Sequence, residues 1–295
     1  MDILEELNGI LHNECIFVDE PMSRHTTFKT GGKADFLVIP QNKDEMLKVL
    51  KLKIPKTIIG NGSNLLVKDG GIRGLFIKTT GLNSYEVNDD VIISDSGVLL
   101  SKLSNVAKDN SLTGLEFACG IPGTLGGAVM MNASAYGGET ANVVFETEYA
   151  DRDGNLYVVN DHKFGYRKSM FTGTDYIILS SKLKLEKGNK EEIESKMQEL
   201  MKSRNEKQPV DKPSAGSTFK RPEGHFAGKL IEDAGLKGFK IGGAMVSSKH
   251  AGFVINESDA TSEDVLNLIK YIQDKVKNEF GVELDPEVRI IGEDK

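Results

Sequence analysis

The part of this sequence that most constrains its fold is GIPGTLGGAVMMNASAYGG, at residues 120–138. Six of these residues are glycine and three are alanine, so the stretch offers little side-chain surface to a hydrophobic core. Glycine loses more backbone freedom on folding than any other residue, and each glycine therefore needs a structural reason. A strained turn is one such reason, and a backbone that must lie flush against a large ligand is another.

A second glycine-rich segment, IIGNGSNLLV, occupies residues 58–67 between two apolar runs. Successive backbone N–H groups in such a loop can form a nest that binds an anion, although a tight hairpin would explain this loop alone equally well. It is not a dinucleotide-binding fingerprint, because that pattern needs a glycine in place of Leu65 and a helix afterwards. Together the two loops favour a cradle for the diphosphate of a flat, extended cofactor.

Composition narrows the class of protein. The length of 295 residues predicts about two domains, and the net charge of −7 argues against a general nucleic-acid binder. Cys15, Cys119 and the five histidines have no metal-ligand spacing, so we expect neither a metal site nor a disulfide framework. The first residues lack the basic start and apolar core of a signal peptide, and no apolar run reaches membrane-spanning length. We therefore expect a cytoplasmic protein.

Hydrophobic periodicity predicts an α+β chain. Apolar residues at helical spacing predict helices at residues 42–53, 99–107, 193–201 and 265–276. Asn42 and Glu45 form the pattern of a capping box at the first helix, and Gly281 is placed to end the last. Short β-rich runs stand at residues 36–39, 57–60, 65–67, 91–94, 176–185, 252–255 and 287–291. The charged, proline-containing segment 204–217 predicts a linker or functional loop between two domains.

Five motifs occur in order between residues 60 and 292: GNGSNLLV, GIPGTLGGAVMMNASAYGG, FGYRKSMF, AGSTFKRPEGHFAGKLIEDAGLKG and PEVRIIG. In this order they resemble the UDP-N-acetylenolpyruvoylglucosamine reductase (MurB) family of peptidoglycan biosynthesis, over nearly the whole chain. Only about one strand and one helix separate the third motif from the fourth, so the chain resembles the shorter branch of the family. That branch lacks an inserted tyrosine-bearing segment, which leaves open how substrate is clamped.

The resemblance implies an FAD-binding fold of the vanillyl-alcohol-oxidase type, an α+β fold whose two subdomains surround the flavin. Residues 1–200 would form this domain, with subdomains at 1–80 and 81–200. Residues 201–295 would form a smaller α/β substrate-binding domain whose last strand returns toward the flavin site.

The family reaction is the reduction of a UDP-N-acetylglucosamine enolpyruvyl ether to UDP-N-acetylmuramate, with non-covalent FAD as cofactor and NADPH as co-substrate. The partners that we expect are these small molecules, with no nucleic acid and no membrane insertion. For the oligomeric state, which the sequence does not determine, we take a monomer as the expectation. The residues implied to hold FAD are Gly60, Asn61, Gly62, Ser63, Asn64, Leu65, Gly120, Ile121, Pro122, Gly123, Thr124, Gly126, Gly127, Ala128, Asn132, Ala135 and Tyr166. We expect a side chain at Gly62 or Gly123 to obstruct the cofactor more than it disturbs folding.

Three residues match the catalytic positions of the family. Arg167, in GYRKSMF, would hold the substrate carboxylate and its enolate, a task that suits a planar two-pronged donor. Ser217, in AGSTF, would donate the proton to the enolate, and Glu287 would assist. Each has a plainer alternative: a surface arginine, a cap or turn serine, and an exposed Glu–Arg pair on one face of a strand with Arg289.

Four further residues match positions near the UDP-sugar in the family: Tyr136, Lys207, Arg221 and His250. The alternative for each is a solvated or packed side chain. Cys119 is the one residue near the loops that could attach a flavin covalently, but we interpret it as a small packed residue. Two other functions stay open: an FAD oxidase or dehydrogenase of the same fold acting on an alcohol or sugar, and a catalytically silent flavin- or nucleotide-sugar-binding regulator.

Overall fold

The computed structural model describes residues 3–295, so Met1 and Asp2, which begin the predicted flavin-binding domain, lie outside the described residues. The chain divides into two compact units, which are described separately. The first unit comprises the residues up to Phe17, residues 36–61 and residues 75–203. The second unit comprises residues 18–35, 62–74 and 204–295.

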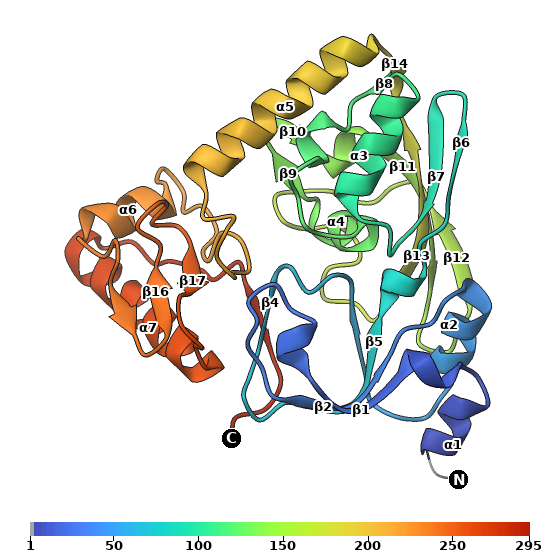
Figure 1. Cartoon of the computed structure of the whole chain (residues 1–295), viewed down its shortest axis with the longest axis horizontal. Coiled ribbons are helices and arrows are strands. Elements are labelled where there is room, and N and C mark those ends of the chain that lie inside the picture. The colour runs from blue at the N-terminus through green and yellow to red at the C-terminus, as the bar shows by residue number, and fades with distance from the viewer. Residues whose placement is uncertain (1–2) are drawn as a thin grey trace. The chain divides into compact units, whose positions relative to one another are not determined.

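A five-stranded antiparallel sheet, in the order β12-β11-β13-β7-β6, dominates the first unit (Figure 1). Its strands are β6 (Tyr85–Asn88), β7 (Val91–Asp95), β11 (Val144–Ala150), β12 (Leu156–Val159) and β13 (Ile177–Lys184). Helix α4 (Leu125–Met131) packs against β13 and β7. Helix α3 (Leu100–Asp109) contributes Leu100 and Leu103 to the same hydrophobic cluster, so both helices cover one core.

A four-stranded sheet has the order β1-β2-β5-β3. Its strands are β1 (Ile16–Pro21), β2 (Lys33–Val38), β3 (Lys56–Ile59) and β5 (Ile72–Lys78). Helices α1 (Ile3–Asn8) and α2 (Lys43–Leu50) contribute buried residues to a core with Leu75 and Ile77 of β5. Strands β3 and β5 are parallel, and β3 leads directly into the loop that starts at Gly60. The sheet therefore sets the start of the first glycine-rich loop.

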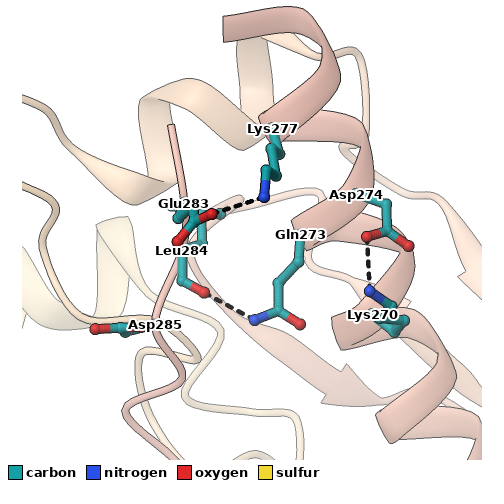
Figure 2. Close-up of a pocket in the computed structure, with 7 residues that line it drawn as sticks. All are labelled: Lys270, Gln273, Asp274, Lys277, Glu283, Leu284 and Asp285. Carbon is teal, nitrogen blue, oxygen red and sulfur yellow. Dashed lines mark hydrogen bonds and ion pairs between the residues drawn. The ribbon is translucent and has the colours of Figure 1, made fainter. Parts of the chain in front are cut away.

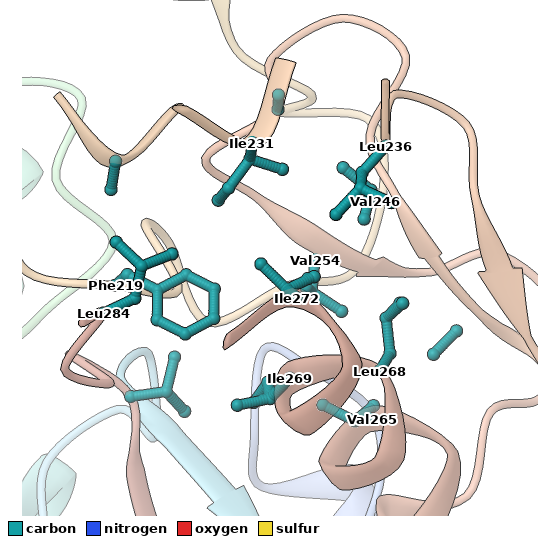
Figure 3. Close-up of a cluster of buried hydrophobic side chains, with 14 of the residues drawn as sticks. Phe219, Ile231, Leu236, Val246, Val254, Val265, Leu268, Ile269, Ile272 and Leu284 are labelled. Carbon is teal, nitrogen blue, oxygen red and sulfur yellow. The ribbon is translucent and has the colours of Figure 1, made fainter. Parts of the chain in front are cut away.

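The second unit is built around helix α7 (Ser262–Phe280), which contacts helix α6 (Ala227–Asp233) and a three-stranded antiparallel sheet. The strands are β15 (Lys240–Ile241), β16 (Ala244–Val246) and β17 (Val254–Asn256). The apolar residues of α7 recur at helical spacing and point into the cluster drawn in Figure 3. Strand β18 (Arg289–Ile291) pairs in parallel with β4 (Leu65–Val67), which follows the first glycine-rich loop.

The remaining elements are one long helix and several short strands and 3₁₀ helices. The long helix is α5 (Lys190–Lys207). The small strands are β8 (Leu112–Thr113), β9 (Ser134–Ala135), β10 (Gly138–Glu139) and β14 (Glu186–Lys187). The 3₁₀ helices are η1 (Asn13–Cys15), η2 (Met22–Arg24), η3 (Thr79–Gly81), η4 (Glu116–Ala118) and η5 (Thr140–Asn142). No helix in residues 3–295 is both long and apolar enough to cross a membrane.

All four predicted helices are confirmed, with shifted ends. Asn42 caps α2 by accepting a hydrogen bond from the Glu45 N–H at 2.9 Å, but the Glu45 carboxylate bonds the N–H of Gln41 rather than that of Asn42. Gly281, with φ of 70°, ends α7 as expected. The predicted common strand face of Glu287 and Arg289 is wrong, because β18 begins only at Arg289.

Candidate active site

Within the first unit, Gly60 and Asn61 at the start of the first glycine-rich loop lie against the second glycine-rich loop. The side-chain amide of Asn61 donates a hydrogen bond to the carbonyl of Pro122 at 2.7 Å. Gly60 approaches Thr124 so closely that a Cβ at position 60 would lie 2.3 Å from the threonine hydroxyl oxygen. The two loops, which are expected to hold one cofactor, therefore also contact each other directly.

Gly60, Gly62 and Gly126 are needed because other parts of the protein pack closely against them. A Cβ at Gly62, where φ is +68°, would lie 2.2 Å from the carbonyl oxygen of His25. A Cβ at Gly126 would lie 2.9 Å from the Cβ of Ser96. At Gly127, which is exposed, the nearest atom to a Cβ would be 3.6 Å away. The expectation for Gly62 needs correction, because a side chain there would meet the protein itself before any ligand.

The expected loop at residues 120–138 contains a helix, α4. Thr124 caps this helix by accepting a hydrogen bond from the N–H of Gly127, and Asn132 ends it in the left-handed conformation with φ of 45°. Leu125, Ala128 and Val129 are buried, at the spacing of one helical face. The four glycines and the threonine around them concealed this short apolar pattern, so the sequence analysis missed the helix.

Arg167 lies in a tight turn in which Gly165 and Lys168 exchange both backbone hydrogen bonds, at 3.0 and 3.2 Å. Arg167 has φ of 55°, a conformation that favours glycine, asparagine and aspartate. Its guanidinium Nη1 donates to the hydroxyl of Ser134 at 2.8 Å, and its Cζ lies 5.3 Å from the ring centroid of the exposed Tyr166. The arginine is thus held by specific contacts rather than extended into solvent.

Ser217 and Glu287 come together in the second unit. The carbonyl of Thr218, the next residue, accepts a hydrogen bond from the N–H of Glu287 at 2.8 Å. The Thr218 hydroxyl accepts a further bond from Val254, also at 2.8 Å, which fixes the segment. Ser217 itself is exposed and caps none of the helices within residues 3–295, so the capping alternative has no support there.

The residues matched to the UDP-sugar fall in both units. Tyr136 belongs to the first unit, is 46% exposed and stands in the turn between β9 and β10. Lys207, at the end of α5, and Arg221 are exposed residues of the second unit. The Arg221 guanidinium carbon lies 4.0 Å from the ring centroid of Phe226, which holds the side chain in place.

His250, also in the second unit, is partly buried and its Nδ1 accepts a hydrogen bond from the N–H of Gly252 at 3.1 Å. Its ring packs edge-on against Phe253, with centroids 5.1 Å apart. Burial lowers the pKa of His250, because removal from water disfavours the charged imidazolium. His250 is therefore a neutral hydrogen-bonding group at neutral pH.

A polar depression of about 210 Å³ lies on the second unit, beside α7 (Figure 2). It is lined by Lys270, Gln273, Asp274, Lys277, Glu283, Leu284 and Asp285. Lys277 pairs with Glu283 at 2.7 Å, and the other lysine of the depression pairs with its acidic neighbour at 2.8 Å. None of the residues predicted from the sequence lines this depression, and we do not assign the candidate site to it.

Two kinds of residue bear on metal and covalent chemistry: the possible metal ligands and the cysteine that could attach a flavin covalently. Residues 3–295 contain no group of three or more histidine, cysteine, aspartate or glutamate side chains arranged to hold a metal ion. Cys119 is partly buried, and its thiol lies 3.8 Å from the carbonyl of Met197. These contacts are those of a packed residue.

Comparisons with known proteins identify the family. Residues 208–291 match the family model described as UDP-N-acetylenolpyruvoylglucosamine reductase, C-terminal domain, and residues 34–160 match an FAD binding domain. A UDP-N-acetylenolpyruvoylglucosamine reductase from Caldanaerobacter subterraneus is 52% identical in an alignment 297 positions long, which covers 99% of this chain and 98% of that protein. The chain belongs to the UDP-N-acetylenolpyruvoylglucosamine reductase family. The family expected from the five motifs is therefore confirmed.

Solved structures agree with this assignment. The crystal structure of the reductase from Thermus caldophilus has a TM-score of 0.82 and 35% sequence identity, and the match covers 93% of this chain and 99% of that one. A pollen glucose dehydrogenase, Phl p 4, has a TM-score of 0.52 at 14% identity over 64% of this chain and 45% of that one, which bears on the fold alone. The expected fold class, an FAD-binding domain followed by the C-terminal domain of this reductase family, is confirmed, and so is the class of flavoprotein oxidoreductase.

Proposed function

We propose that this chain reduces the enolpyruvyl ether of UDP-N-acetylglucosamine to UDP-N-acetylmuramate, with FAD as cofactor and NADPH as electron donor. Membership of the reductase family and the match to an FAD-binding domain support this reaction. We further propose that the enzyme acts in the cytoplasm as a monomer. Its partners are then the two small-molecule substrates, without nucleic acid.

The two glycine-rich loops are proposed to hold FAD. The residues of these loops at 60–65 and 120–128 carry no charged side chain, so N–H groups and small polar side chains are the available partners for a diphosphate. Gly127 supports this assignment, because it is exposed in a helix and no packing contact explains the absence of a side chain. The bound flavin would supply the hydride chemistry, from NADPH to the enolpyruvyl carbon.

Arg167 is proposed as the residue that binds the substrate carboxylate and stabilises the negative charge that develops as the enolate forms. A guanidinium offers two parallel donors to a carboxylate and stays charged at every accessible pH. Its contact with Ser134 at 2.8 Å restricts the side chain before substrate arrives. Electrostatic stabilisation of this kind is most effective when the donor is already in position.

Ser217 is proposed to donate a proton to the enolate, with Glu287 as its partner. The observation that carries this proposal is the backbone pairing that brings the two residues together, in which Thr218 accepts from the Glu287 N–H at 2.8 Å. The exposed position of the Ser217 side chain leaves it available to a substrate. Serine is a weak acid, so Glu287 would act on the charge and hydrogen bonding around it.

The UDP-sugar is proposed to contact Tyr136, Lys207, Arg221 and His250. Lys207 and Arg221 are exposed cations suited to a diphosphate, and the stacking of Arg221 on Phe226 limits the freedom that binding would remove. Neutral His250 can hydrogen-bond a sugar hydroxyl or amide without charge.

An absorption spectrum taken in three steps tests the proposed reaction. The purified protein should carry a flavin spectrum, NADPH should bleach it, and the UDP-sugar enolpyruvyl ether should restore it under anaerobic conditions. A protein that stays bleached with that substrate but is rapidly reoxidised by oxygen would instead be an oxidase. A protein that takes up no FAD at all would contradict the proposed function.

Replacing Gly127 with valine should abolish FAD binding while the fold persists. The side chain has room within the protein, since its nearest neighbour would lie 3.6 Å from the Cβ, but it would stand where the cofactor is proposed to lie. Valine is also a slightly better helix former than glycine, by roughly a few tenths of a kcal/mol. Flavin content after desalting and the melting temperature of the apoprotein measure the two effects.

Gly126→Val is the matched control for this prediction. Its Cβ would lie 2.9 Å from that of Ser96, so the variant should lose thermal stability even without FAD. If Gly127→Val binds FAD normally, the exposed face of α4 does not contact the cofactor.

A further inference from the structure

Several residues of the first unit other than glycine have a positive φ, and three of them are connected by hydrogen bonds or carried by the connected turns. They are Asn132, Tyr136 and Arg167, with φ of 45°, 52° and 55°. Such a conformation is uncommon for a bulky side chain, and it persists only where the surroundings determine it. Strained residues of this kind often cluster at functional sites, so the contacts that hold them deserve a functional test.

Asn132 joins the two turns that carry the other strained residues. Its side-chain oxygen accepts a hydrogen bond from the N–H of Ala141 at 2.9 Å. Its side-chain nitrogen donates to the carboxylate of Glu139 at 3.1 Å and to the carbonyl of Gly165 at 3.3 Å. Glu139 belongs to the hairpin that presents Tyr136, and Gly165 begins the turn that presents Arg167. Both the oxygen and the nitrogen of the buried Asn132 amide are therefore hydrogen-bonded to other groups of the protein.

Ser134 makes the second connection between the two turns. It is part of β9, which pairs with β10 so that Ser134 lies opposite Glu139. Its hydroxyl accepts a hydrogen bond from Nη1 of Arg167 at 2.8 Å. The hairpin therefore contacts the arginine turn at its backbone, through Asn132, and at its guanidinium, through Ser134.

We propose that Ser134 and Asn132 are positioning residues for Arg167. Asn132 fixes the backbone turn on which the arginine stands, and Ser134 fixes the direction of its guanidinium. This inference rests on the proposed function of Arg167 as the group that binds the carboxylate and the enolate. Asn132 then acts through the arginine turn, and its role does not depend on direct contact with FAD.

The physical basis is pre-organisation. An unrestrained arginine has many rotamers, and ordering it at the moment of reaction would cost free energy that a preformed contact avoids. A neutral hydroxyl acceptor restrains the guanidinium without itself neutralising the positive charge. A misplacement of about 1 Å at such a group can reduce the rate by about a hundredfold.

The decisive experiment measures the two half-reactions of Ser134→Ala separately by stopped-flow flavin absorbance. Bleaching by NADPH and FAD content should stay near the wild-type values, because Arg167 is not assigned to the first half-reaction. Reoxidation by the enolpyruvyl ether should slow about tenfold, the lower end of what a hydrogen bond to a charged group contributes. Ser134→Thr should restore the rate, because threonine keeps the hydroxyl acceptor.

A double-mutant cycle with Arg167→Lys separates positioning from other roles. Ser134→Ala should have little further effect in the Arg167→Lys background, because the guanidinium it positions is already absent. The proposal would be overturned if the effects of Ser134→Ala and Arg167→Lys on the reoxidation rate were fully additive. It would also be overturned if Ser134→Ala reoxidised at the wild-type rate. Failure of the wild-type protein to reoxidise with this substrate would instead overturn the proposed function.

Asn132→Gly tests the backbone connection without adding backbone strain, since glycine accepts the left-handed conformation. It also removes the hydrogen bonds to Ala141 and Gly165, so thermal unfolding is measured alongside the rates. It should also slow reoxidation selectively. Thr172→Val is the comparison variant, because its hydroxyl donates to the carbonyl of Met130 at 3.0 Å in the same unit and belongs to neither of the two turns. If Asn132→Gly and Thr172→Val each slow both half-reactions to the same extent, the effect is a general loss of packing in this region. The proposed positioning role of Asn132 would then be wrong.

Discussion

Replacing Ser217 with alanine should slow reoxidation of the reduced enzyme by the enolpyruvyl ether by at least about a hundredfold, the lower limit of typical general acid–base contributions. The enolate would form without an acid to protonate it. Bleaching by NADPH should proceed at close to the wild-type rate, because no proton from Ser217 is required in that half-reaction. Ser217→Cys should recover part of the loss, since a thiol is a stronger acid than a hydroxyl.

Thr218→Val provides the comparison for this prediction. Thr218 is buried, and its hydroxyl accepts a hydrogen bond from the N–H of Val254 at 2.8 Å, so its removal should lower thermal stability without a selective effect on either half-reaction. Stopped-flow absorbance of the flavin and thermal unfolding distinguish the two variants. Wild-type reoxidation in Ser217→Ala would mean that another group delivers the proton.

The long helices could be predicted because their apolar residues recur regularly. In α7 the buried residues Val265, Leu268, Ile269, Ile272 and Val276 follow the helical period, and Gly281 marks its end. Helix α4 could not be predicted in this way. It has only seven residues and begins within a glycine-rich stretch, so glycine content outweighed its short buried face. The local pattern of apolar residues therefore predicts long helices well. It predicts short helices poorly, because their position depends on packing against other segments.

The glycines show the same limit at the site. Sequence alone does not distinguish Gly62 from Gly127, because both stand in glycine-rich segments. In the structure, a Cβ at Gly62 would meet the carbonyl of His25, whereas one at Gly127 would meet nothing closer than 3.6 Å. The difference depends on which segments pack together, and that information is not local.

The motifs led to Arg167, Ser217 and Glu287 because a resemblance carries residues over by position. Nothing comparable pointed to Ser134. Its contact with Arg167 joins residues 33 positions apart in the chain, and a serine in a small-residue stretch has no distinctive pattern. The positive φ of Arg167 was equally hidden, because arginine is not a residue that signals such a turn.

Replacing Arg167 with glycine should severely slow reoxidation by the enolpyruvyl ether while thermal stability changes little. Loss of a group that stabilises developing negative charge typically lowers the rate by about a hundredfold to a thousandfold. The left-handed conformation costs a residue other than glycine about 1–2 kcal/mol, and glycine would relieve it. Loss of the hydrogen bond to Ser134, a bond to a charged group worth about 1.5–3 kcal/mol, and of the contact with Tyr166 opposes that gain. Activity and stability should therefore separate in this variant.

Arg167→Lys is the matched variant, because it keeps the positive charge and the strained backbone but removes the two-pronged donor. If the contact with substrate strengthens as the enolate forms, kcat should fall and not merely KM rise. A change confined to KM would assign Arg167 to ground-state binding alone. A large loss of thermal stability in Arg167→Gly would mean that the arginine serves the fold, since the strain at φ of 55° would then be outweighed by its contacts. Steady-state kinetics and thermal unfolding of the two variants, measured together, decide between a residue kept for catalysis and one kept for structure.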